Sequence, residues 1–163
     1  MEPVTAIAWG ASAVLAAIAG AVVGPWIRQT LRRREMQARE QREMIEEWLE
    51  LSRFKVSHPA VVLMMVDRGE DPQQAARWGL AAFIQSTQER TVRWPLDPAR
   101  VRHKMVRQLC HDLNQATNNL TMAMVGLASG GSPETFAKVT RDGLDRAQAL
   151  RETIIEEMVK AGW

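Results

Sequence analysis

Tyrosine is absent from this 163-residue sequence, phenylalanine occurs only three times, and cysteine occurs once. Aromatic residues favour strands, so their shortage predicts an all-α protein. The single cysteine, Cys110, excludes an intramolecular disulfide framework and is typical of a reducing compartment. The composition therefore indicates a helical protein without disulfide bonds.

Charge is missing from residues 4–27, VTAIAWGASAVLAAIAGAVVGPWI, a run of 24 residues. About 20 apolar residues at a rise of 1.5 Å cross a hydrocarbon core of about 30 Å. Lipid cannot satisfy backbone polar groups, so such a run spans as an α-helix. We therefore predict a transmembrane anchor at residues 1–27, and residues 28–163 are enough for one further domain.

Basic residues follow this run at once, whereas the side-chain charge before it is Glu2. They are Arg28, Arg32, Arg33 and Arg34. Because arginine is retained on the cytoplasmic side, the sequence predicts a single-pass inner-membrane protein with its N-terminus outside and its body in the cytoplasm. A cleavable signal peptide is the alternative, but it carries its positive charge before a shorter apolar core.

Small residues recur every four positions within the predicted span. They are Ser12, Ala16, Gly20 and Gly24. A stripe of this kind lets helix backbones approach closely in lipid, which predicts self-association through the membrane helix. The general abundance of alanine and glycine in the span explains the pattern equally well.

Residues 28–57 contain neither glycine nor proline and are predicted to form a charged juxtamembrane helix that ends at His58-Pro59. Residues 58–96 are then predicted to form a pair of short helices. The first ends with Gly69 as the left-handed residue after the helix, and the second begins at Asp71-Pro72.

An antiparallel helical hairpin is predicted for residues 97–163, starting at Asp97-Pro98 and turning at Ser129–Pro133. The first arm has apolar residues at alternating spacings of three and four. This seam consists of Val106, Leu109, Leu113, Ala116, Leu120, Ala123 and Leu127. The inward positions of the second arm are Phe136, Val139, Gly143, Ala147, Leu150, Ile154 and Met158.

His111 lies opposite the seam, so we expect it to be exposed, and Asp112 follows it. An exposed helical histidine followed by an acid, on a hairpin of two long helices, resembles the phosphoacceptor hairpin of sensor histidine kinases. Residues 118–121 and Gly126 are similar to the continuation of that motif, displaced by about one helical turn. The sequence has no nucleotide-binding glycine motif, so this resemblance implies that His111 accepts phosphate from a partner kinase.

A second basic segment spans residues 90–107. Candidate contacts to an anionic partner are Arg93, Arg100, Arg102, Lys104 and Arg107. They could meet nucleic-acid phosphates or lipid headgroups, although a solvated helix face explains them as well. The histidines are scattered, with no HExxH or CxxC spacing, so we expect neither a metal nor another cofactor.

Together these features predict a non-enzymatic membrane protein that acts through self-association and protein contacts of its cytoplasmic helical domain. It would be a homo-oligomeric scaffold or membrane assembly, and a pore is one form of such an assembly. One alternative is the signalling hairpin with His111. The other is a membrane-tethered accessory protein that binds nucleic acid.

Overall fold

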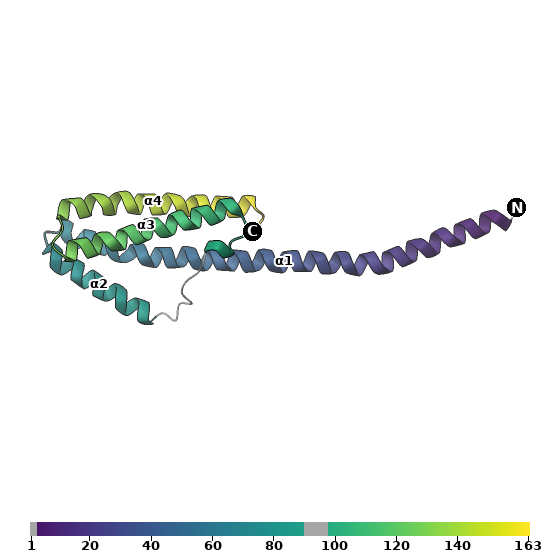
Figure 1. Cartoon of the computed structure of the whole chain (residues 1–163), viewed down its shortest axis with the longest axis horizontal. Coiled ribbons are helices and arrows are strands. Elements are labelled where there is room, and N and C mark those ends of the chain that lie inside the picture. The colour runs from purple at the N-terminus through teal and green to yellow at the C-terminus, as the bar shows by residue number, and fades with distance from the viewer. Residues whose placement is uncertain (1–2, 90–97) are drawn as a thin grey trace. The chain divides into compact units, whose positions relative to one another are not determined.

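The computed structural model describes the backbone of residues 3–89 and 98–163 and the side chains of residues 26–88 and 99–163. Its helices are α1 (Pro3–Asp67), α2 (Pro72–Glu89), α3 (Lys104–Ala128) and α4 (Pro133–Lys160) (Figure 1). A 3-10 turn, η1 (Pro98–Arg100), precedes α3. No strand occurs in the described ranges, and the all-α prediction is confirmed.

The chain divides into two compact units, Met1–Glu40 and Gln41–Trp163. The first consists of the N-terminal part of α1. The second holds the rest of α1 together with α2, α3 and α4, and both hydrophobic cores lie within it. We call this second unit the bundle.

The predicted helix end at His58-Pro59 is wrong, because α1 continues without interruption to Asp67. A proline inside a helix removes one backbone donor, a cost of about 3 kcal/mol. Pro59 is fully buried, and Val62 in the next turn is buried as well, so burial of apolar surface offsets that cost. The hydroxyl of Ser57 donates to the Phe54 carbonyl over 2.7 Å, just before the proline.

The end of α1 and the start of α2 follow the sequence signals. Gly69 has φ +84°, and its N–H donates to the Val66 carbonyl while the next residue donates to Met65. This is the Schellman arrangement that a residue without Cβ favours, and it confirms Gly69 as the terminating residue of α1. The carboxylate of Asp71 accepts from the Gln74 N–H over 2.7 Å, which caps α2 as predicted.

The predicted hairpin is present, with α3 and α4 packed side by side (Figure 1). Its first arm begins at Lys104, however, and not at Asp97-Pro98. The ring of His103 caps α3 by accepting from the Val106 N–H, and η1 occupies the chain before it. The side chain of Gln41 in α1 binds the segment before α3. Its Oε1 accepts from Arg102 N over 2.8 Å, and its Nε2 donates to the Arg100 carbonyl over 3.2 Å.

The inner face of the hairpin is closed by α1 of the same chain. Ile45 and Trp48 of α1 are buried in one core with residues of both hairpin helices. The members from those helices are Val106, Cys110, Leu113, Ala147, Ile154 and Met158. The hairpin therefore completes its core within one chain and needs no second hairpin for that purpose.

Helix α3 packs against more than one neighbour, so its buried face is wider than the predicted seam. Of the seven seam residues, Leu109 and Ala123 are half-buried and the other five are buried. Three further residues, Cys110, Thr117 and Met124, are buried at seven-residue intervals beside them. Three apolar positions in every two turns are typical of a helix inside a globular bundle.

A second core joins α1, α2 and the turn end of the hairpin around Val62, Met124, Leu127 and Phe136. Helices α1 and α2 approach closely here. A Cβ placed on Gly79 of α2 would lie 2.3 Å from Cγ2 of Val62, so the contact requires glycine.

Candidate functional site

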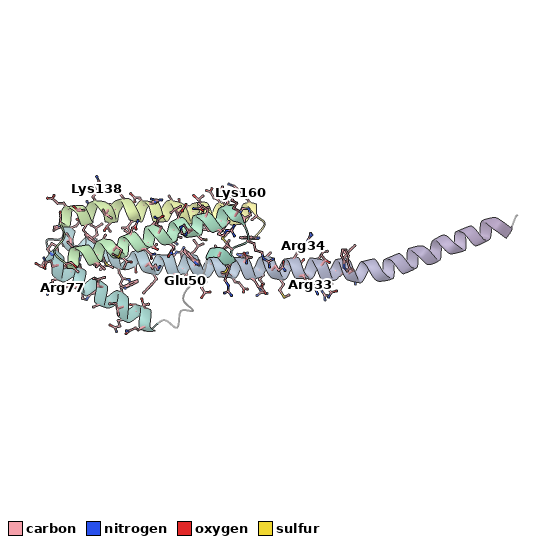
Figure 2. The ribbon with its side chains drawn as sticks, viewed as in Figure 1. Arg33, Arg34, Glu50, Arg77, Lys138 and Lys160 are labelled. Carbon is pink, nitrogen blue, oxygen red and sulfur yellow. The ribbon has the colours of Figure 1, made fainter. Side chains whose placement is uncertain are left out.

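The predicted anchor falls mainly on residues 1–25, whose side chains are outside the described set. The stripe Ser12, Ala16, Gly20 and Gly24 lies there too. Within the part of the chain that the structure describes, no helix has an apolar stretch long enough to cross a membrane. After that region, Trp26 and Ile27 are exposed, and Figure 2 shows Arg33 and Arg34 projecting from α1 in different directions.

His111 is exposed on α3, as its position opposite the seam predicts. The neighbouring Asp112 is half-buried and accepts from Gln108 Nε2 over 2.9 Å. Cys110, the residue before His111, is buried in the core, where loss of solvation raises the pKa of its thiol to about 12. The thiol is therefore protonated at neutral pH and is not a nucleophile.

Three of the predicted basic contacts surround one hollow at the start of α3. Its volume is about 740 Å³, and it is lined by Arg102, His103, Lys104, Met105, Arg107 and Gln108. Arg100 is exposed in the preceding turn, whereas Arg93 lies outside the described residues. The hollow can attract an anion, since exposed guanidinium and ammonium groups gather there. The ring of Trp163 packs edge-on against His103, with ring centroids 5.8 Å apart.

An apolar groove between α3 and α4 is a feature that sequence reasoning missed. It has a volume of about 360 Å³. Its lining consists of Asn119, Met122, Ala123, Gly126, Leu127, Gly131, Ser132, Thr135, Phe136 and Val139. Two of its apolar residues are exposed, Met122 at 64% and Val139 at 40%.

The inward position predicted for Val139 is therefore wrong, and Thr140 is the buried residue at this level of α4. Helix periodicity allows either of two neighbouring positions to face inward, and polarity alone favours Val139 over Thr140. The better signal was the three-and-four spacing itself, because Phe136, Thr140, Gly143 and Ala147 continue it without a change of face.

A polar cluster lies inside the bundle between α1 and α3. The ammonium Nζ of Lys55 donates to Oδ1 of Asn114 and to Oδ1 of Asn118, each over 3.2 Å. Lys55 is buried, and the lost solvation lowers its pKa. The cluster joins two helices that are distant in the sequence, which gives it a role in positioning them.

Among the described residues, no group of three or more His, Cys, Asp or Glu side chains is arranged to hold a metal ion. Comparison of the chain with protein-family models, with curated proteins and with solved structures finds no match in any of the three.

Proposed function

We propose that this protein is a membrane-tethered, non-enzymatic helical adaptor that works by self-association and by contacts of its body with other proteins. Residues 4–27 would anchor it as a single pass, with the N-terminus outside. The arginines that follow would hold the bundle in the cytoplasm.

The observation that supports this proposal best is the apolar groove on a bundle whose core is already complete. Ile45 and Trp48 fill the inner face of the hairpin, so the exposed Met122 and Val139 are not needed to close the core. Large apolar side chains that gather in a groove at the surface are typical of interaction sites. A tethered protein also meets its partners at a raised local concentration, so a modest surface can suffice.

The test uses the full-length protein. Membranes that contain it are washed with alkaline carbonate, and the retained protein is then purified in mild detergent. Its mass is measured by light scattering over a wide concentration range. We expect retention in the washed membrane and a mass above that of one chain. Release by carbonate would overturn the anchor, and a monomer at every concentration would overturn self-association.

A second candidate function is phosphate acceptance by His111 from a partner kinase. The observation that favours it is the exposed ring on the same helix as the basic side chains Lys104 and Arg107, which can attract a phosphate group. We expect acid-labile phosphate on the wild-type chain after incubation with cell extract and ATP, and none on His111→Ala. Equal labelling of the variant would remove this function.

A further inference from the structure

The hollow at the start of α3 is lined by positively charged side chains. Arg102, Lys104 and Arg107 belong to its lining, and all three are exposed. No carboxylate lines it among the described residues, and residues 98–111 of the sequence contain neither aspartate nor glutamate. Like charges that lie close together repel one another, so a bound anion would lower their energy.

Two of these cations are available to a ligand. Lys104 and Arg107 are three positions apart, so they project from one face of α3. Neither forms an ion pair with another residue that the structure describes. Other exposed cations of the bundle do have carboxylate partners, as in the pairs Arg42–Glu46, Arg141–Asp67 and Lys160–Glu157. The charge of Lys104 and Arg107 therefore serves no described contact of the bundle.

His103 adds a positioned hydrogen-bond donor to the lining. Its Nδ1 accepts from the Val106 N–H over 3.4 Å, and the Trp163 ring packs edge-on against it. Because Nδ1 is the acceptor, the proton of the neutral imidazole lies on Nε2, which can donate to a ligand. The ring is half-buried and held from two sides, so this donor is fixed while the long cationic side chains can adjust.

The hollow is larger than one small ion. Its volume of about 740 Å³ lies within the range of about 300–1,000 Å³ that is typical of small-molecule sites. Its lining also includes Met105, whose side chain is 54% exposed and offers an apolar contact. A ligand that fits this lining therefore combines an anionic group with a larger and less polar part.

We propose that the hollow binds a phosphate monoester. Such a group carries about 1.5 to 2 negative charges at pH 7 and has three acceptor oxygens, so it matches several cations better than a carboxylate does. The Arg107 guanidinium would donate to two phosphate oxygens, and the Lys104 ammonium would add a point charge. His103 Nε2 would donate a further hydrogen bond, and Met105 would contact the rest of the ligand.

The phosphate monoester can belong to a soluble molecule or to a lipid headgroup. The side chain of Gln41 binds the backbone of Arg100 and Arg102, so the hollow lies at the end of the bundle where its part of α1 begins. Gln41 follows Arg28, the first basic residue after the predicted anchor, by 13 positions, which is about 20 Å of helix. This short tether brings headgroups within reach of the bundle. The site goes beyond the proposed function and does not depend on it.

Titration calorimetry on the full-length protein in mild detergent tests the site with two probes. Glycerol 3-phosphate is the soluble probe, and phosphatidic acid in mixed micelles is the lipid probe, because both present a phosphate monoester. We expect saturable binding of at least one of them. Binding of glycerol 3-phosphate identifies a soluble ligand, and binding of phosphatidic acid alone identifies a headgroup. Absence of binding by both would overturn the inference, as would equal affinity for phosphatidic acid and for the diester phosphatidylglycerol.

Two lysines provide a matched comparison. Lys104 lines the hollow, whereas Lys138 is exposed near the turn of the hairpin, and Figure 2 shows it at the opposite end of α4 from Lys160. Lys104→Gln and Arg107→Gln should each raise Kd about tenfold, because a hydrogen bond to a charged group is lost. Lys138→Gln makes the same change in net charge and should leave Kd unchanged.

Two further outcomes would overturn the site. Equal effects of Lys104→Gln and Lys138→Gln would show that the probes respond only to net charge. Binding of a DNA duplex in place of both probes would assign the basic side chains to nucleic acid. The carbonate wash and the mass in detergent test the proposed function without either probe, so the two proposals can fail separately.

Discussion

Lys55 of α1 and Asn114 of α3 meet inside the bundle, where the lysine Nζ donates to the amide Oδ1 over 3.2 Å. The two residues are 59 positions apart in the sequence. Asn118, one turn further along α3, accepts from the same ammonium group. This cluster links α1 to α3 through a buried charge, which is costly.

Removing the charge of Lys55 should not lower the stability of the bundle. Lys55→Met keeps an unbranched apolar side chain of similar length and removes the desolvated ammonium group. Asn114 and Asn118 are partly exposed and can form hydrogen bonds with water in its place. We expect the free energy of unfolding at pH 7 to be unchanged or higher by up to about 2 kcal/mol. Lys55→Ala, which also removes the stem, should lower it. Urea denaturation measures both, and a large loss in Lys55→Met would show that the ammonium stabilises the bundle.

The same lysine should make stability depend on pH. Burial lowers its pKa in the folded state, so the folded protein loses this proton at a lower pH than the unfolded chain, whose lysine pKa is about 10.4. Between those two values the unfolded state binds more protons, and stability rises with pH. The stability of the wild type relative to Lys55→Met should therefore increase as pH approaches about 10. A difference that stays flat from pH 7 to 10 would contradict the lowered pKa.

Two threonines of the core, Thr140 and Thr117, differ in their hydrogen bonding. Both are buried, but Thr140 Oγ1 has no hydrogen-bond partner among the described residues, whereas Thr117 Oγ1 donates to the Asn114 carbonyl over 3.0 Å. Thr140→Val should raise the free energy of unfolding by about 1 kcal/mol, because it removes an unsatisfied polar atom. Thr117→Val should lower it or leave it unchanged. Thermal denaturation of the two variants side by side checks the contrast, and equal shifts would refute it.

Two helical glycines should respond in opposite ways to a single methyl group. In Gly143→Ala the new Cβ collides with Leu120, and we expect a loss of about 1–3 kcal/mol despite the better helix propensity. Gly126→Ala meets open space and should gain about 0.5–1 kcal/mol in the dissociated chain. Denaturation at concentrations where the wild type is dissociated measures both, and a gain in Gly143→Ala would mean that Leu120 can move aside.

The rate at which Cys110 is alkylated should report how readily the bundle opens. Burial raises the pKa of its thiol to about 12, so the reactive thiolate is scarce in the folded state at pH 8. We expect alkylation by iodoacetamide to be at least about 100-fold slower than in denaturant, and to accelerate in Gly143→Ala as opening becomes easier. Rapid alkylation of the native protein would show that this part of the core opens readily.

Local signals in the sequence predict the helical class, the turn at residues 129–133, the end of α1 and the start of α2. Gly69 and Asp71 specify those ends because their conformational preference and capping act within a few residues. Most of the seam of α3 could also be assigned from spacing alone, since burial of one helix face follows the helix period.

Which residues cover that seam depends on how the helices pack together. Ile45 and Trp48 of α1 cover it. Local sequence rules predict that this helix ends at Pro59, but it continues to Asp67, because burial in the bundle offsets the cost of the proline. The groove, the exposure of Val139 and the contact of Lys55 with Asn114 also depend on how helices distant in the sequence pack together. Hydrophobic spacing identifies which face of a helix is buried, but only packing selects the partner that covers it.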